Sequence, residues 1–283
     1  MKLDLVLMAA VLCAALMHAS WNAIVKTERD RLIGFGLVMV TGTVICAPLL
    51  PFLGPMSAKA IPWLMLSGAV HVCYYFFLLS AYAHGDLSHV YPIARGLGPT
   101  LVAILSGALI GEHLSLHEYG GVLLVSLGIM ALALAKGFGN WGGRGTLFAI
   151  VTGFTIAGYT FADGLGGRAS GNPIAYIAWF NVVEGPWVLA FAMWKRRPGV
   201  VLTYARIEGR RSAIGGVIAT LGYGIAIYAL SVGALAHVAA LRETSVLFAT
   251  VIGTRLLGEP FGRWRLLAAV MIVCGLVLMN LTL

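Results

Sequence analysis

One acidic and two basic residues of this sequence lie deep in segments that are otherwise apolar. Glu184 is at the middle of the run IAWFNVVEGPWVLA, Arg95 lies in PIARGLGPT, and Arg242 lies in a later apolar run. A charged side chain at the centre of a membrane helix costs about 2.5–3.5 kcal/mol, so it tends to be paired, hydrated or functional. A carboxylate binds ammonium groups or protons, and the planar guanidinium of arginine binds carboxylates.

Each of these three residues also has a structural alternative. Glu184 either serves in a cavity or forms an ion pair that only stabilises the fold. Arg95 either holds a substrate carboxylate, neutralises Glu184 or reaches the membrane boundary. Arg242 is followed directly by Glu243, which points about a third of a turn away on a helix, so one of the two faces a cavity while the other pairs elsewhere.

Other polar and aromatic residues are candidates for the wall of a binding pocket. The segment HASWNAIVK places His18, Trp21 and Asn22 on one helix face, which suits a cavity better than lipid. The other histidines in apolar segments are expected to be packing residues. The remaining pocket candidates are aromatic residues inside apolar runs, namely Tyr75, Tyr82, Tyr159 and Trp179.

The composition is that of a polytopic membrane protein. Hydrophobic residues make up 60% of the chain and charged residues 11%, and apolar runs of about twenty residues alternate with short polar breaks. The net charge of +8 comes from basic residues that lie mostly between these runs, so nucleic acid is not an expected partner. The expected partners are the lipid bilayer and a small-molecule substrate, for a monomer or homodimer. The four cysteines form no CxxC pair, so neither a metal site nor any cofactor is expected.

The apolar runs predict an all-α membrane protein with ten transmembrane helices, because uniformly apolar runs of this length do not fit barrel strands. The predicted helices are 3–25, 33–53, 60–83, 89–110, 115–135, 145–163, 173–194, 212–234, 236–257 and 261–281. The prolines and glycines of PIARGLGPT are expected to disturb the fourth helix. The polar stretch 195–211 is expected to be a solvated loop.

Two stretches of the chain match one another. The run from His89 to Glu112 begins with His-Val and ends with Leu-Ile-Gly-Glu, and the run from His237 to Glu259 begins with His-Val and ends with Leu-Leu-Gly-Glu. The match predicts two repeats, residues 1–136 and 145–283. Because each repeat holds five helices, an odd number, the second copy must enter the membrane upside down, as in many secondary transporters.

The distribution of Lys and Arg predicts the orientation. Three basic residues fall on the side of the two termini and thirteen fall in the loops of the other side. Loops rich in basic residues are cytoplasmic, so both termini are expected outside the cytoplasmic membrane.

With these features the chain resembles the drug/metabolite transporter superfamily, in its ten-helix EamA branch. The resemblance rests on the two five-helix halves, on HASWNAIVK, and on the Gly-Glu pairs that close helices four and nine, Gly111-Glu112 and Gly258-Glu259. It implies an inner-membrane carrier for small metabolites, often amino acids, with a central cavity lined by both halves and no use of ATP. The sixth helix carries GYTFAD where the family usually has a Trp-containing turn, which leaves the substrate open.

The leading hypothesis is therefore a secondary transporter that moves a small polar or zwitterionic metabolite by alternating access, outward across the cytoplasmic membrane. An amino acid, aromatic ones included, is the favoured substrate class. Export of organic cations is the alternative within transport, and a membrane receptor or intramembrane enzyme is the alternative outside it. The sequence contains no HExxH, GxSxG or Walker motif in a suitable context, so it predicts no catalytic residues.

Overall fold

The computed structural model describes residues 4–133, 143–256 and 262–280. In these ranges the chain forms α-helices and two short 3-10 helices, η1 and η2, and contains no strand. The helices are α1 (Leu5–Lys26), α2 (Arg31–Cys46), η1 (Ala47–Phe52), η2 (Ala58–Ala60), α3 (Ile61–His84), α4 (Leu87–Ile110), α5 (Leu116–Ala131), α6 (Arg144–Ala169), α7 (Pro173–Arg196), α8 (Pro198–Val232), α9 (Leu235–Arg242), α10 (Ser245–Leu256) and α11 (Arg263–Asn280).

The predicted all-α membrane fold with ten spans is confirmed. In the described ranges, nine helical segments are long and apolar enough to cross a membrane, one of them formed by α9 and α10 together. Helix α5 is the tenth helix of the bundle and is shorter but also apolar. The protein is thus a multi-pass membrane protein.

Local sequence signals set several helix ends. Asp4 accepts a hydrogen bond from the amide of Leu7 and begins α1, and Asp30 accepts bonds from two amides at the start of α2. Ser115 and Glu118 form a capping box at the start of α5. Each cap satisfies amides that have no partner within the helix, which fixes where the chain re-enters a helix after a short connection.

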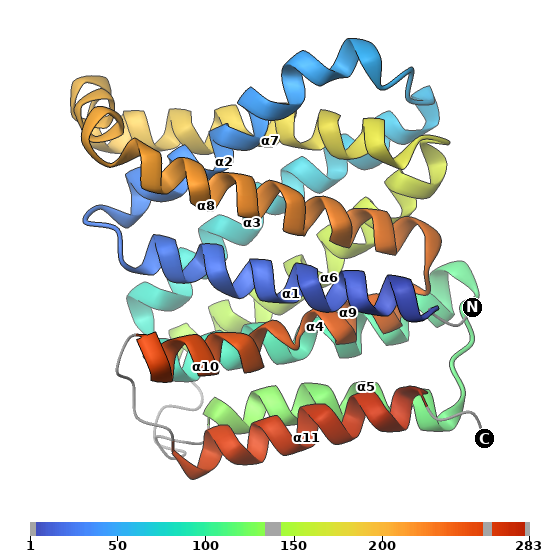
Figure 1. Ribbon diagram of the computed structural model, residues 1–283. Helices are drawn as coiled ribbons and strands as arrows, with labels where there is room; N and C mark the ends of the chain where they lie inside the picture. The colour runs from blue at the N-terminus through green and yellow to red at the C-terminus, as the bar shows by residue number, and fades with distance from the viewer. Residues whose placement is uncertain (1–3, 134–142, 257–261, 281–283) are drawn as a thin grey trace.

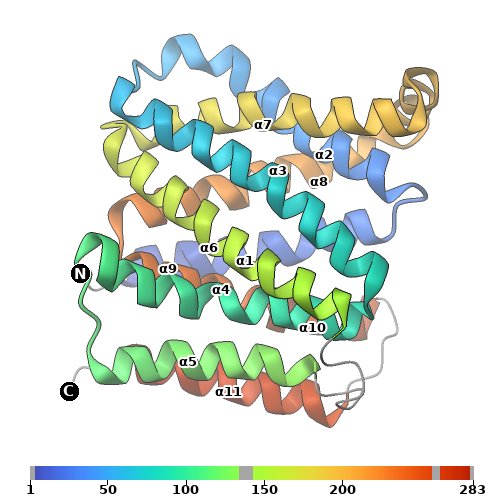
Figure 2. The same ribbon diagram turned by 180° about the vertical axis from the view of Figure 1, so that it is seen from behind.

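The helices lie side by side with their axes running across the view in Figure 1, and both termini lie at the same end of the molecule. Helices α1 and α8 form one face of the bundle, and α3 and α6 form the face seen from behind in Figure 2. The closest packing joins α3 with α6, α1 with α8, α2 with α7, and α5 with α11. Every one of these pairs joins a helix from residues 1–136 with a helix from residues 145–283.

The α5–α11 contact depends on small residues. A Cβ atom on Gly121 would lie 2.6 Å from the carbonyl oxygen of Gly275, and one on Gly275 would lie 2.7 Å from the carbonyl oxygen of Gly121. Glycine at both positions lets the two backbones approach closely, which strengthens van der Waals contact in lipid.

Two predicted boundaries were wrong. The stretch 195–211 is not a loop, because α7 continues to Arg196 and α8 begins at Pro198, so all of its basic residues except Arg197 lie in helices. Proline is favoured in the first turn of a helix, where no amide hydrogen bond is lost, and it allows this early start. The sixth helix continues to Ala169 rather than ending at Asp163, which places Asp163 in the helix interior.

The disturbed helix is not the one expected. Helix α4 is continuous although it contains Pro92 and Pro99, whereas the segment that the sequence predicts as its repeat counterpart is interrupted at Glu243 and Thr244, between α9 and α10. At the interruption the amide of Thr244 bonds to the carbonyl of Leu241, three residues back, and the Thr244 hydroxyl donates to that same carbonyl. Such local bonds compete with the regular helical ladder and tighten the turn.

Candidate functional site

Two small hollows lie between helices near the middle of the bundle, and both are lined by Arg95 and Arg242. The first is also lined by residues of α1 and α8, including His18, and the second by residues of α4 and α6, including Tyr159. Each is a narrow cavity of about 10 Å³. A cavity of this size holds about one water molecule. The bundle is therefore closed around these polar groups.

Arg95 forms an ion pair with Glu243 from the interruption between α9 and α10. The guanidinium Nη2 is 2.9 Å from Glu243 Oε1, and both side chains are about 5% exposed, at 6% and 5%. Nη2 also lies 3.5 Å from the hydroxyl of Ser245. Arg95 Nε and Glu243 Oε2 have no hydrogen-bond partner in the described part of the chain. Arg95 is thus neutralised by Glu243 and not by Glu184.

Arg242 lies beside this pair but is bound differently. Its guanidinium carbon is 5.3 Å from the centre of the Tyr223 ring, a cation–π contact. Within the described ranges it has no carboxylate at ion-pair distance. It also lines both hollows with Arg95. A guanidinium without an ion-pair partner, held over an aromatic face at a polar hollow, can receive a carboxylate.

Glu184 of α7 meets α3. Tyr75 donates a hydrogen bond to Glu184 Oε1 at 2.7 Å, and His71 Nε2 is 4.0 Å from that oxygen. The side chain of Glu184 is 11% exposed, so it lies in the bundle and not on the lipid face. Its hydrogen bond from Tyr75 holds the carboxylate in position toward α3.

A second acid, Asp163 of α6, was missed by the sequence analysis. It is fully buried and accepts hydrogen bonds from Ser67 at 2.6 Å, from Tyr223 at 2.5 Å and from Tyr176 at 3.3 Å. These three hydroxyl donors occupy both oxygens of the carboxylate. The signal that could have found it is a lone acid in an apolar, glycine-rich run. The predicted end of the sixth helix at this residue hid that signal.

Aromatic rings connect the hollows with the two acids. Trp21 packs edge-on against His18 at 5.3 Å and stacks on Phe35 at 6.1 Å, and Phe35 meets Tyr75 at 5.4 Å. His71 stacks on Tyr159 with the ring centres 4.2 Å apart. This continuous aromatic surface offers an apolar side chain a place between the charged groups.

The structure brings most of the predicted site residues together. Arg95, Arg242 and His18 line one hollow, and Tyr159 lines the other. A further group, Trp21, Tyr75 and Glu184, is joined to them by ring contacts and a hydrogen bond.

Three predicted residues lie apart from this group. Asn22 is exposed and its amide donates to the carbonyl of His18 in its own helix. Trp179 is 40% exposed on α7. Tyr82 packs against a separate apolar cluster of α3, α4 and α6, although it lies within electrostatic range of Arg95.

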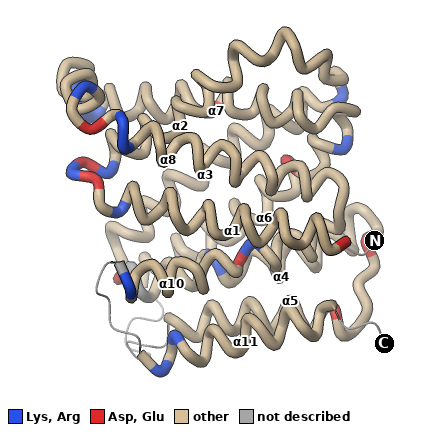
Figure 3. Tube along the Cα trace, viewed as in Figure 1, with Lys and Arg blue, Asp and Glu red and all other residues tan. Residues whose placement is uncertain are grey.

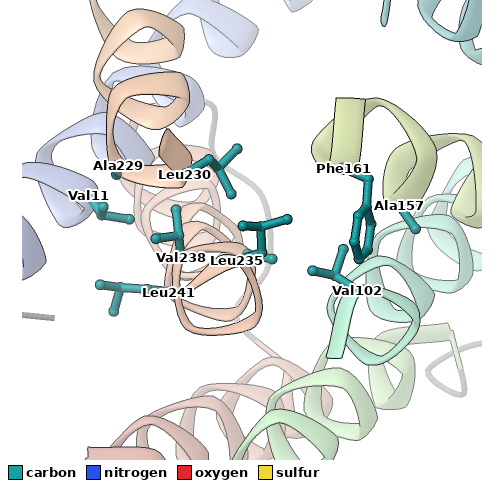
Figure 4. Close-up of a cluster of buried hydrophobic side chains, with 10 residues drawn as sticks. Val11, Val102, Ala157, Phe161, Ala229, Leu230, Leu235, Val238 and Leu241 are labelled. Carbon is teal, nitrogen blue, oxygen red and sulfur yellow. The ribbon is translucent and has the colours of Figure 1, made fainter. Parts of the chain in front are cut away.

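An apolar cluster closes the hollows on the side of the termini. It joins Val11, Val102, Phe161, Leu230, Leu235, Val238 and Leu241 with their alanine neighbours, from α1, α4, α6, α8 and α9 (Figure 4). On α1, α6, α8 and α9 the cluster includes residues nearer the termini than the residues that line the hollows, and on α4 Val102 belongs both to the cluster and to the lining of the second hollow. The cluster therefore seals the polar groups from that side of the membrane.

Polar contacts tie the chain together beyond this seal. Arg168 at the end of α6 forms an ion pair with Glu112 at 2.7 Å and donates to the carbonyl of Gly233 at 2.7 Å. Glu112 also accepts a bond from the amide of Leu235, at the start of α9. We call Glu112, Arg168 and their two backbone partners the Glu112–Arg168 contact group. Glu259, the predicted counterpart of Glu112, lies outside the described residues.

The opposite end carries a second tie. Glu28, in the connection between α1 and α2, is 7% exposed and accepts hydrogen bonds from Tyr204 at 2.5 Å and Ser212 at 3.1 Å. Arg196 pairs with Asp30 at 2.7 Å in the same region. Figure 3 shows that Lys and Arg gather at this end of the molecule, opposite the termini.

The chain was compared with known proteins. A sequence model of the EamA-like transporter family matches residues 1–134 and 143–281. A chloroplastic WAT1-related protein of Arabidopsis thaliana is 24% identical over 201 residues, which are 64% of this chain and 46% of that protein, so the chain spans about half the length of this curated relative. A crystal structure aligns with a TM-score of 0.75 at 18% identity, over 97% of this chain and 95% of the other, which shows the fold alone.

The family match covers nearly the whole of the ten-helix bundle and both sets of helices that line the hollows. It agrees with the resemblance expected from HASWNAIVK and Gly111-Glu112. Members of this family are transporters and not enzymes. The chain therefore belongs to the EamA-like transporter family, within the drug/metabolite transporter superfamily.

Proposed function

We propose that this transporter exports a small zwitterionic metabolite, an amino acid in the first instance, across the cytoplasmic membrane by alternating access. The observation that supports this most is the placement of both signs of charge beside closed hollows, Arg242 on one side and Glu184 on the other, with aromatic rings between them. An α-amino acid carries one carboxylate and one ammonium group, so it matches both charges.

Arg242 is the residue we assign to the substrate carboxylate. Arg95 is already paired with Glu243, and an approaching carboxylate would have to displace Glu243 from it. Arg242 lies over the Tyr223 ring, has no ion-pair partner in the described part of the chain and lines both hollows, so its N–H donors are available to a carboxylate there. Arg95 positions the interruption after α9, and Arg242 is carried at the end of that helix.

Glu184 is the residue we assign to the ammonium group. Its Oε1 accepts from Tyr75, which leaves Oε2 for a second partner. The rings of Trp21, Phe35 and Tyr75 lie along the path from His18 to Glu184, and they would contact the substrate side chain. This surface favours amino acids with apolar or aromatic side chains.

The closed hollows hold about one water each, so a substrate enters only when the halves move apart. We propose that residues 1–136 and 145–283 are inverted repeats that rock against each other. The apolar cluster and the Glu112–Arg168 contact group close the side of the termini, and the hydrogen bonds of Glu28 close the other side. The basic end faces the cytoplasm, and both termini lie outside.

Counterflow into liposomes that contain the purified protein tests this function. A panel of labelled amino acids, nucleosides and quaternary amines is offered to protein with the unlabelled compound inside. Losing hydrogen bonds to a charged group costs about 1.5–3 kcal/mol, so Arg242→Met is expected to weaken amino acid binding about 10- to 150-fold. Glu184→Gln should lose the amine contact in the same way.

Trp179→Phe is the matched control, because Trp179 is on α7 with Glu184 but is 40% exposed and lies apart from the residues around the hollows. Full counterflow of every amino acid in both Arg242→Met and Glu184→Gln would refute these roles. Export of organic cations is the second candidate, favoured by the aromatic rings around Glu184. It predicts counterflow of quaternary amines that is lost in Glu184→Gln and kept in Arg242→Met.

A further inference from the structure

We propose that His71, Asp163 and Glu184 together bind one proton, and that this proton is the ion exchanged for the substrate. We call these three residues the proton cluster. The inference rests on the proposed function only in naming what the proton is exchanged for. The site itself is a buried group of two acids and a histidine from α3, α6 and α7.

Without substrate, the charge balance of the bundle centre favours a bound proton. Among the described residues, the carboxylates there are Asp163, Glu184 and Glu243, and the permanent cations are Arg95 and Arg242. If all three acids were ionised, one negative charge would be left without a partner in a medium where uncompensated charge is costly. One proton on the proton cluster makes the centre neutral.

The hydrogen bonds around Asp163 keep the proton off that residue. Ser67 and Tyr176 donate to Oδ1 and Tyr223 donates to Oδ2, so both oxygens serve as acceptors. A protonated acid would have to turn one of these oxygens into a donor that faces another hydroxyl. Asp163 is therefore the fixed anion of the cluster.

His71 is the residue with room for the proton. Its Nδ1 lies 2.9 Å from the carbonyl oxygen of Ser67, which only accepts, so Nδ1 carries a hydrogen. Its Nε2 lies 3.4 Å from the hydroxyl oxygen of Tyr223, whose single hydrogen is already directed at Asp163. A neutral His71 would present a lone pair to another lone pair, whereas a protonated Nε2 presents a donor.

The groups that surround the cluster are consistent with this role. Tyr74 and Tyr75 on α3, Tyr159 on α6 and Phe180 on α7 contact the His71 ring. Tyr223 on α8 separates His71 from Arg242, and Arg242 is the cation nearest to the cluster from α9. Apart from Asp163 and Glu184, the groups that face His71 from these helices are therefore hydroxyls, rings and one arginine.

Glu184 links the proton to the substrate. Its Oε1 lies 4.0 Å from His71 Nε2, so a small approach lets the N–H bond of the imidazolium break as an O–H bond forms on the carboxylate. The proton leaves the bundle from Glu184 or returns to His71. A zwitterionic substrate brings an ammonium group to Glu184 and a carboxylate to Arg242, so both side chains gain charged partners without the proton. The negative charge that then remains is the one on Asp163, which three hydroxyl groups stabilise. The carrier therefore holds the proton or the substrate and exchanges them.

Infrared titration of the protein in lipid nanodiscs, without substrate, tests the proton site directly. Wild type is expected to show one buried imidazolium that loses its proton in a single step, and this signal should vanish in His71→Gln. Tyr223→Phe should shift the step, because it removes a donor to Asp163 and the oxygen beside Nε2. His84→Gln is the control: His84 makes the same contact to the carbonyl four residues back on α3 but is exposed.

Transport tests the coupling. Liposomes loaded with labelled L-phenylalanine are given an acidic exterior, with the membrane potential clamped by potassium and valinomycin. One pH unit corresponds to about a tenfold driving force for one-for-one exchange, or about 1.4 kcal/mol. Wild type should show gradient-driven efflux. The ratio of gradient-driven efflux to phenylalanine counterflow should fall in His71→Gln and stay at the wild-type value in His84→Gln.

The outcomes separate the two proposals. An infrared titration of His71→Gln identical to that of wild type overturns the proton site, whatever is transported. Active counterflow without a response to the pH gradient in wild type overturns the coupling. Absence of phenylalanine counterflow in wild type, together with a proton step that depends on His71, overturns the proposed substrate and supports the proton site.

Discussion

The ion pair between Arg95 and Glu243 allows the two arginines of the site to be separated. Arg95→Met leaves Glu243 buried at 5% exposure with no ion-pair partner, and its Oε2 already lacks a hydrogen-bond partner. Removing one partner of a buried pair costs about 3–5 kcal/mol, whereas replacing both with apolar residues of similar volume is close to neutral. The double variant Arg95→Met with Glu243→Met should therefore recover most of the lost stability.

The assay is thermal or denaturant unfolding in detergent, combined with amino acid counterflow on the same preparations. Arg95→Met should unfold far more easily than wild type, and the double variant should unfold near wild type. The double variant should also keep measurable counterflow, because Arg242 remains to hold the carboxylate. A double variant as stable as wild type but without counterflow would show that Arg95 contacts the substrate and would refute the assignment of Arg242.

Three further predictions concern the packing and the two ends. Gly121→Val should cost about 1–3 kcal/mol in thermal unfolding, because its Cβ would meet the α11 backbone at 2.6 Å; unchanged stability would contradict the close α5–α11 contact. Arg168→Met should lower the free energy of unfolding by about 1 kcal/mol, since its pair with Glu112 is partly exposed. It should also raise the labelling of a cysteine introduced in the first hollow, Ala226→Cys, by a reagent applied from the side of the termini. Partial desolvation raises the pKa of Asp30, but bonds from Arg196 and backbone amides outweigh it and leave this pKa lowered. The stabilisation is thus complete above about pH 4 and is lost as the pH falls further. Arg196→Met should reduce this loss in acid unfolding but not remove it, because the backbone amides of Leu32 and Ile33 still donate to Asp30.

The fold was largely predictable because the bilayer limits the possibilities. Apolar runs of about twenty residues admit only helices, so the ten spans followed from hydropathy. The grouping of Arg95, Arg242 and His18 was also predictable in part, because polar residues in apolar runs seldom face lipid.

The sequence-based predictions that failed concerned residues whose roles depend on tertiary contacts. Nothing local in the sequence indicated that Arg95 would pair with Glu243 rather than Glu184, because the choice depends on how α4 meets the interruption after α9. Asp163 was missed through a helix boundary that was six residues short. His71 was interpreted as a packing residue, since its role depends on acids that arrive from α6 and α7.

The account depends on a central space that opens to each side of the membrane in turn. Ala226 lines the first hollow and is 1% exposed, so Ala226→Cys reports on that space in a background where Cys13, Cys46, Cys73 and Cys274 are replaced by alanine. A membrane-impermeant maleimide should label this cysteine from either side of vesicles, and a transported amino acid should slow the labelling from both. Labelling by lipid-soluble reagents alone, with none from either aqueous side, would contradict alternating access through this site.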